Sequence, residues 1–358
     1  MGKQGIRLPV FIYSFLIYSL LALPGEPAPL VLSETEGPTF TLILVGDVML
    51  GRGVAQALDG DWEAAFAEVQ PWLAEAGGST ELTEVLAFAN LESPLTTAPL
   101  LPSFLPLGGT EGGQYDLRAP PEAVAALRAA GFNVVSLANN HALDAGGAGL
   151  QETVSTLSAA GIAPLVNWET GTLVNLESGT SPVYRSTNLP TYQMLAFDDS
   201  AAPLDIEAAS RAVAAAAEQV GVVIVSIHWG GEYQAAPSPR QQAVARTLAD
   251  AGADLIVGHG PHVLQRVEWV GETLVAYSLG NFLFDQPYPA DCRQGAILRV
   301  TLQGDRIVTV GAVPTVVEQG RAKPAGPEDA VAILARLRIY ESTNLRTYEP
   351  TNNQEQKP

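Results

Sequence analysis

The hydrophobic pattern of the chain is a series of short apolar runs, each bounded by glycine or by polar residues. Residues 40–46, FTLILVG, are continuously apolar, which is typical of a strand buried on both faces. Residues 85–92, 134–141, 222–228 and 253–259 follow the same pattern. Each run therefore predicts one strand of an interior sheet.

Helical spacing precedes several of these runs, and a glycine separates each helix from the strand after it. Residues 120–131, PPEAVAALRAAG, begin with proline and end with glycine, as helices commonly do. The same order of helix, glycine and strand recurs around Gly161, Gly221 and Gly252, and residues 61–78 also have helical spacing. Such αβ units build a parallel-rich sheet that is covered by helices.

The pattern changes in the last third of the chain. Residues 266–280 and 295–317 are strand-like runs interrupted by GE and GD turns, which predict antiparallel hairpins. Residues 327–340 begin with proline and have the spacing of a closing helix. This mixture predicts an α/β fold in which two sheets pack face to face with helices outside.

The N-terminus differs from the rest of the chain. Two basic residues precede an apolar stretch, residues 8–23, and a Pro- and Gly-rich linker follows. This order is typical of a secretory signal or a membrane anchor, although a span usually needs about 20 residues. We expect residues 1–38 to be signal peptide or anchor plus linker, residues 39–340 one domain, and residues 341–358 a flexible tail. The domain would then be extracytoplasmic, either secreted or anchored to the cytoplasmic membrane.

Composition and charge exclude some classes of function. The chain is 47% hydrophobic and 16% charged, which is typical of a well-buried globular protein. Its net charge is −19 and its basic residues are scattered, so it lacks the basic patch that nucleic acid requires. Cys292 is the only cysteine, which excludes an intrachain disulfide and a cysteine-based zinc site.

All four histidines follow apolar strand-like runs. His141, His228 and His259 come at the ends of such runs, and His262 lies three residues after His259. Ligand sites in open α/β sheets form at the carboxyl ends of strands. Imidazole and carboxylate ligands together suit Zn, Mn or Fe ions.

Acidic and amide side chains follow the same rule. Asp47 ends the first apolar run, and Asn90 and Glu92 would share one face of the next strand. Taken singly, Asp47 could be a helix cap, Asn140 a turn residue, and any one histidine a structural residue. The joint occurrence favours a metal site, with enough ligands for two ions about 3.5–4 Å apart that share a carboxylate.

Six motifs occur in order along the chain: GDVMLGR (46–52), ANLESPLT (89–96), SLANNHALDAG (136–146), VVIVSIHWGGEY (222–233), ADLIVGHGPHVLQ (253–265) and YSLGNFLFDQ (277–286). They resemble the motif series of the CapA family, bacterial poly-γ-glutamate capsule synthesis proteins, which is similar to the calcineurin-like metallophosphoesterases. The resemblance implies a four-layer α/β/β/α metallophosphoesterase-like sandwich. It also implies a role in making, exporting or anchoring a cell-surface polymer.

The resemblance implies specific roles for residues of this chain. The implied metal ligands are Asp47, Glu92, Asn140, His228, His259 and His262, with Glu92 or Asn90 in the bridging position. His141, beside Asn140, would act as the acid or orient a phosphate-like group. The weaker candidates for substrate contact are Arg52, whose guanidinium could bind an anion, and Asn90, Glu232 and Asn281.

The chain departs from the wider phosphoesterase pattern in three places. Met49 stands where the first motif has histidine, two residues separate His259 from His262 instead of one, and Glu92 replaces aspartate. The loss of an imidazole leaves open whether two ions bind and whether phosphate esters are substrates.

The expected function is capsule or exopolymer biosynthesis with a metal-dependent hydrolase- or transferase-like site. Two divalent metal ions, Mn, Fe or Zn, are expected to activate water there. The expected partners are an anionic polymer such as poly-γ-glutamate and membrane synthase or export subunits. The alternative is a non-enzymatic subunit that keeps the fold as a scaffold for binding polymer or for its export.

Overall fold

The computed structural model describes residues 30–32, 39–73, 83–101, 116–167, 183–184 and 191–339. The apolar stretch 8–23 and the expected tail 341–358 lie outside the described residues. Among the helices that are described, none has both the length and the apolar character needed to span a membrane.

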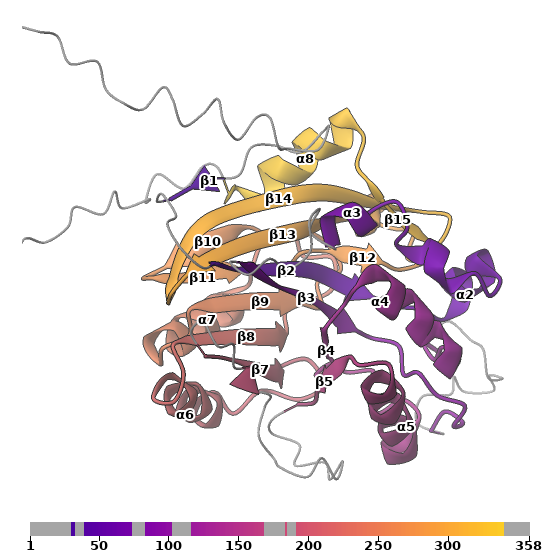
Figure 1. Cartoon of the computed structure of the whole chain (residues 1–358), viewed down its shortest axis with the longest axis horizontal. Coiled ribbons are helices and arrows are strands. Elements are labelled where there is room, and N and C mark those ends of the chain that lie inside the picture. The colour runs from indigo at the N-terminus through magenta and orange to yellow at the C-terminus, as the bar shows by residue number, and fades with distance from the viewer. Residues whose placement is uncertain are drawn as a thin grey trace, which may run out of the picture.

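Two β-sheets form the centre of the molecule (Figure 1). The larger sheet contains β1 (Leu30–Val31), β2 (Thr39–Val48), β3 (Thr83–Leu91), β4 (Val134–Ser136), β5 (Ala163–Leu165), β12 (Asn281–Leu283), β13 (Gln294–Gln303), β14 (Arg306–Glu318) and β15 (Arg321–Pro324). Within the described residues its order is β1-β14-β13-β2-β3-β4-β5, with β12 beside β2 and β15 beside β14. Strands β2 to β5 are parallel, as the αβ units predict.

The smaller sheet contains β6 (Val183–Tyr184), β7 (Tyr192–Asp198), β8 (Val222–His228), β9 (Leu255–His259), β10 (Val267–Val270) and β11 (Thr273–Ala276). Its order in the described part of the chain is β10-β11-β9-β8-β7-β6. Strands β7, β8 and β9 are parallel, and β10 and β11 form the predicted hairpin. The second predicted hairpin is β13 with β14.

Helices cover both outer faces of the sheet pair. The larger sheet is covered by α2 (Arg52–Leu58), η2 (Trp62–Ala65), α3 (Gln70–Leu73), η4 (Pro121–Ala123), α4 (Val124–Ala130) and α5 (Gly146–Ala159), the smaller by α6 (Ile206–Ala217) and α7 (Pro239–Asp250). The remaining helices are η5 (Ala290–Arg293) and α8 (Pro327–Leu337), of which α8 packs on β13 and β14 and buries Ile333 between the sheets.

The alternation of side chains along each strand creates the layers. On β2, Leu42 and Leu44 join the apolar cluster between the two sheets, whereas Ile43 and Val45 face the helices. On β8, Ile224 faces the same inter-sheet cluster. Both sheets are therefore buried on both faces, which confirms the predicted four-layer α/β/β/α sandwich.

Local signals set the helix boundaries. Helix α7 begins with a capping box between Ser238 and Gln241, and α4 ends at Gly131 in the left-handed region, with φ 89°. Residues 61–78 have helical spacing with a start or kink expected at Pro71, and the structure describes two short elements there, η2 and α3, while residues 74–82 lie outside the described part. Pro71 lacks an N–H group and fits only the first turn of a helix, so one continuous helix could not pass through it.

Two other expectations require correction. Strand β4 ends at Ser136, so His141 lies in a turn beyond the strand and not at its end. Part of the expected linker is a strand, because β1 pairs with β14 in the register Leu30 to Val310. Such pairing depends on a distant strand, which the local composition of residues 24–38 does not show.

A β-bulge changes the direction of side chains near the end of β2. Leu44 pairs with Phe88 and Asp47 pairs with Asn90, so β2 has one residue more than β3 between these pairs. The extra residue returns Asp47 to the inter-sheet face that Leu44 occupies. Gly46 lies in this bulge and packs against the backbone of Gly280, the residue before β12. A Cβ added to Gly46 would lie 1.9 Å from the Gly280 carbonyl oxygen.

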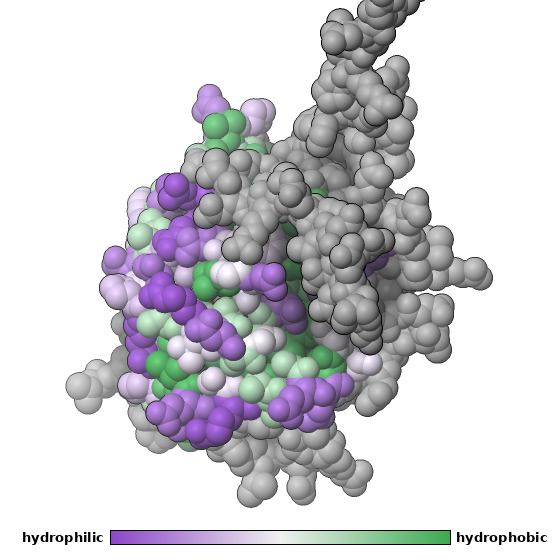
Figure 2. Space-filling view, turned by 90° about the vertical axis from the view of Figure 1, so that its left-hand side faces the viewer, coloured by the Kyte–Doolittle hydropathy of each residue, from purple (hydrophilic) through white to green (hydrophobic). Residues whose placement is uncertain are grey.

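The end of the sheets opposite to the carboxyl ends of the parallel strands has an ordinary solvated surface. Figure 2 views this side and shows hydrophilic residues interspersed with paler and hydrophobic ones. The polar side chains at the carboxyl ends are, by contrast, largely buried. This difference locates the candidate site.

We predict opposite effects for two glycine-to-alanine substitutions. Gly46→Ala should lower the free energy of unfolding by about 3 kcal/mol or more, because the methyl group must displace backbone. Gly147→Ala, in the first turn of α5 with open space around it, should raise that free energy by about 0.5 kcal/mol. Chemical denaturation measures both, and equal stability of the two variants would contradict the bulge argument.

Candidate functional site

The larger sheet contributes a row of polar side chains at one level. Asp47 on β2 is in register with Asn90 on β3 and with Asn281 on β12. Glu92 follows β3 directly and lies two residues beyond Asn90. All four are buried, with exposed fractions of 0–1%, so they form the polar end of the layer between the sheets.

The smaller sheet contributes a matching row. Asp198, the last residue of β7, is in register with His228 on β8, and His228 is in register with His259 on β9. His262 follows in the turn after β9 and has a positive φ of 58°. The side chains of these strands continue the inward face that their apolar residues occupy, which directs them toward the first row.

Direct contacts join the two rows. The His228 Nε2 atom lies 3.1 Å from Glu92 Oε1. His259 Nδ1 and His262 Nδ1 lie 3.3 Å from the two carboxylate oxygens of Asp47. Asp47, Glu92 and His262 offer ligand atoms that all lie within 4.8 Å of one another and could hold a metal ion.

Opposite charges keep the buried carboxylates ionised. Burial raises the pKa of Asp47, but contacts with His259 and His262 outweigh burial and hold that pKa well below its usual range. Burial also raises the pKa of Glu92, and the charge of His262 and the hydrogen bond from His228 lower it below its usual value.

The same attractions act on the histidines. Burial lowers the pKa of His228, but hydrogen bonds to Asp198 and Glu92 raise it to about 10. Burial likewise lowers the pKa of His262, and the charge of Glu92 with the contact to Asp47 raises it to about 9. The raised pKa of each histidine and the lowered pKa of each carboxylate therefore share one cause, the contact between the two kinds of side chain.

Several buried atoms of this cluster that could ligate a metal make no hydrogen bond to the described residues. They are Glu92 Oε2, Asn140 Oδ1 and both ring nitrogens of His259. A buried polar atom that lacks a partner costs free energy, so such atoms are rare unless an ion or water completes them. Carboxylate oxygens and imidazole nitrogens are the donors that Zn, Mn and Fe accept. The donor set therefore fits a divalent metal.

Asparagines hold the ligand candidates in place. The Asn90 amide donates to Asp47 Oδ1 at 2.9 Å and to Glu92 Oε1 at 3.1 Å, and Asn281 Oδ1 accepts from His262 Nδ1 at 2.9 Å. Both asparagines are fully buried. Their predicted contact with substrate is not tested by these bonds, which give each of them an orienting role.

The two adjacent asparagines of the Asn-His motif differ. Asn139 donates to Asn90 Oδ1 at 3.1 Å and to the Leu91 carbonyl at 2.9 Å, so it ties the turn after β4 to β3. Asn140 lies 3.2 Å from His141 Nε2 through its amide nitrogen, and its oxygen has no partner. The Asn140 oxygen is therefore available as a ligand atom, and the place of Asn140 in the metal set stays a prediction.

His141 is held by a buried carboxylate. Its Nδ1 donates to Asp144 Oδ2 at 2.9 Å, and Asp144 has no exposed surface. Burial raises the pKa of Asp144 despite the opposing effect of His141. The ring is fixed with Nε2 directed away from Asp144, on the side of the cavity described below.

Sequence reasoning missed the support of His228. Its Nδ1 lies 2.8 Å from Ser200 Oγ, and Ser200 donates in turn to Asp198. Asp198 ends an apolar run, residues 192–198, so the rule that selected the other candidates would have found it. Ser200 follows in a bend and carries no sequence signal of this kind.

Met49 occupies the place of the missing histidine without replacing its chemistry. It is fully buried among the apolar residues on the helix-covered side of the larger sheet. Its sulfur accepts the Gly51 N–H at 3.0 Å. The side chain therefore contributes to the core and offers no ligand to the polar cluster.

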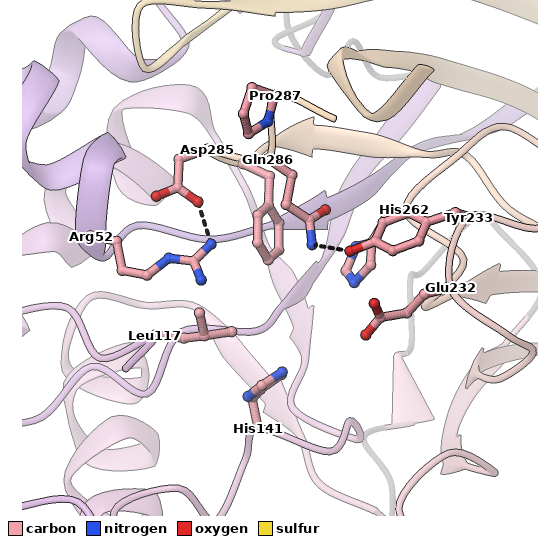
Figure 3. Close-up of a pocket in the computed structure, with 10 residues that line it drawn as sticks. Arg52, Leu117, His141, Glu232, Tyr233, His262, Asp285, Gln286 and Pro287 are labelled. Carbon is pink, nitrogen blue, oxygen red and sulfur yellow. Dashed lines mark hydrogen bonds and ion pairs between the residues drawn. The ribbon is translucent and has the colours of Figure 1, made fainter. Parts of the chain in front are cut away.

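A cavity of about 370 Å³ opens beside the cluster (Figure 3). It is lined by Arg52, Leu117, His141, Glu232, Tyr233, His262, Phe284, Asp285, Gln286 and Pro287. His262 belongs both to this lining and to the metal candidates, so the cavity reaches the cluster directly. Of the predicted substrate contacts, Arg52 and Glu232 lie here, whereas Asn90 and Asn281 do not.

Comparison with solved structures supports the fold. A structure titled as a novel phosphatase from Mycoplasma pneumoniae matches 82% of this chain and 97% of its own, with a TM-score of 0.52. Its sequence identity is 11%, so the likeness concerns the fold alone.

Comparison with sequences gives the family. "Capsule biosynthesis protein CapA" of Bacillus anthracis is 29% identical over 323 residues, 85% of this chain and 73% of that protein. "PGA biosynthesis protein CapA" of Bacillus subtilis is 30% identical and covers 68% of this chain, which spans 62% of that protein. A family model described as "Bacterial capsule synthesis protein PGA_cap" matches residues 41–286, more than half of the chain. The chain therefore belongs to the family of bacterial PGA_cap capsule synthesis proteins.

Proposed function

We propose that the buried cluster is a divalent metal site of hydrolase type that acts in capsule polymer synthesis outside the cytoplasm. The observation that carries the proposal is the convergence of buried ligand atoms from both sheets, some of which make no hydrogen bond to the described residues. A cluster built only for stability would pair these atoms internally. The names of the relatives support the assignment to capsule polymer synthesis.

The residues that would hold the metal are Asp47, Glu92, Asn140, His228, His259 and His262. Their mixture of oxygen and nitrogen atoms suits Mn, Fe or Zn, and their number suits two ions. A divalent ion in such a site supplies Lewis acidity and lowers the pKa of water.

His141 is the proposed acid of the reaction. Its Nδ1 is held by Asp144 at 2.9 Å, and the ring lines the cavity next to the cluster. A carboxylate on Nδ1 fixes the orientation of the imidazole, so that the other nitrogen could pass a proton to a leaving group.

A second candidate function is a non-enzymatic scaffold that binds the polymer or takes part in its export. The packing of Met49 in the apolar core favours this alternative, because one imidazole of the metallophosphoesterase pattern is absent. The expected partners, an anionic polymer and membrane synthase or export subunits, are common to both candidates. So is the proposed location, secreted or anchored to the membrane by the N-terminal segment.

Removal of the central carboxylate should abolish metal binding. Asp47 contacts His259 and His262 and lies in the group that could hold an ion. We expect Asp47→Asn to weaken Mn binding by more than the roughly 100-fold that loss of an outer partner can cost. Metal analysis after equilibrium dialysis measures this, with Asp305→Asn in the β13–β14 turn as control. Unchanged stoichiometry in Asp47→Asn would exclude the proposed centre.

A substitution of Asp144 should distinguish the enzyme hypothesis from the scaffold hypothesis. Asp144→Asn keeps the side-chain shape but removes the charge that orients His141, so turnover should fall by about 10²- to 10⁴-fold with metal content unchanged. The assay uses metal-loaded protein with aryl phosphate and γ-glutamyl oligomer substrates. Metal-loaded wild type that turns over none of these substrates would support the scaffold.

Polymer binding should depend on the metal. The protein has a net charge of −19, so an acidic polymer is repelled unless cations in the site bind its carboxylates. Chelation should therefore abolish binding of poly-γ-glutamate at low salt, and added Mn should restore it. Binding that survives chelation, measured by calorimetry, would contradict this role of the metal.

A further inference from the structure

The cavity of Figure 3 has strained backbone in its lining. Among the described residues other than glycine, six have positive φ, and three of them, Arg52, Tyr233 and His262, line this cavity. Their φ values are 45°, 64° and 58°. Left-handed backbone in bulky residues persists only where the surroundings enforce it, and it collects at ligand sites. These positions mark the cavity as a ligand site, and Arg52 and Tyr233 do so apart from the metal candidates, to which His262 belongs.

Arg52 is already neutralised on its side of the cavity. Its guanidinium forms an ion pair with Asp285 and lies over the Phe284 ring, 5.5 Å from the centroid. The second oxygen of Asp285 accepts the Gly53 N–H at 3.0 Å. The pair is thus fixed in position and contributes hydrogen-bonding groups with little net charge.

Glu232 lies on the opposite side with a carboxylate that no cation of the described residues pairs. Figure 3 shows it directed into the cavity between His262 and His141. Glu232 is an exposed residue, and the residue after it is held by two bonds: the Tyr233 N–H donates to the Pro261 carbonyl at 2.8 Å and Gln286 donates to the Tyr233 hydroxyl at 3.4 Å. A carboxylate at this place favours a cationic donor on the ligand.

The two sides together specify a zwitterionic ligand. The metal candidates, reached through His262, attract an anionic group, and Glu232 attracts an ammonium group. In a γ-linked glutamyl chain, every residue carries an α-carboxylate, but only the amino-terminal residue also carries a free ammonium on the same carbon. We propose that this cavity binds the amino-terminal residue of a γ-glutamyl chain, with Glu232 as the residue that recognises its ammonium group.

This inference rests on the proposed function and adds selectivity for the chain end. The two ideas predict opposite effects of one change in the ligand. Acetylation of the amino terminus adds net negative charge, which should leave binding through the metal unchanged or strengthen it. Recognition by Glu232 predicts that acetylation weakens binding.

The test compares γ-glutamyl decamers with a free and an acetylated amino terminus, by calorimetry on the full chain loaded with Mn. The free decamer should bind about tenfold more tightly, and Glu232→Gln should remove that preference. Glu272→Gln is the matched control, because Glu272 is exposed in the β10–β11 turn at the amino end of β11. This control should keep the preference.

Four results would overturn the inference. Equal or tighter binding of the acetylated decamer would leave the metal-dependent site standing and remove the role of Glu232. A preference that persists in Glu232→Gln would place the ammonium elsewhere. Loss of Mn from Glu232→Gln would make Glu232 a metal ligand. Failure of both decamers to bind the wild type would instead exclude the proposed polymer function together with this inference.

Discussion

The alternation of side chains along the strands is the constraint on which this site depends. The same inward face that carries Leu42 and Leu44 on β2 must carry Asp47, and only the bulge at Gly46 makes this possible. Without the extra residue, Asp47 would face the helices, where a buried carboxylate has no histidine to compensate it. The steric fit of Gly46 against the Gly280 backbone thus links the packing of the larger sheet to the chemistry at its edge.

The cluster pairs its buried carboxylates with histidines, but some of its polar atoms make no hydrogen bond. The first property explains how the charges are buried, and the second bears on metal binding. Burial of Asp47 and Glu92 is compensated because His262 lies 3.3 Å from Asp47 and His228 lies 3.1 Å from Glu92. A purely structural network would also satisfy its remaining donors, since each unpaired atom costs free energy. Within the described residues His259 makes no hydrogen bond through either ring nitrogen, although its Nδ1 lies 3.3 Å from Asp47 Oδ1, so its nitrogens are available as ligand atoms.

Much of this arrangement follows from local sequence, and the remainder depends on non-local pairing. Apolar runs that end in polar residues predicted the strands carrying Asp47, Asn90, His228 and His259, because a buried strand must be continuously apolar. The pairing of β1 with β14 could not be predicted, since two residues in a Pro-rich segment carry no periodicity. The contact of Ser200 with His228 likewise depends on how β7 and β8 align.

The orientation of the histidines and the place of Met49 bear on whether the site is catalytic. His228 on the smaller sheet is oriented through Ser200 and Asp198, and His262, in the turn after β9, is oriented through Asn281 of the larger sheet. These partners fix ring orientation, which packing of the fold does not require and ligation does. Met49, which follows β2 of the larger sheet, lies in the apolar core and not among the candidate ligands. One ligand of the metallophosphoesterase pattern is therefore absent, while the oriented imidazoles of His228 and His262 retain the geometry that a bound ion would need.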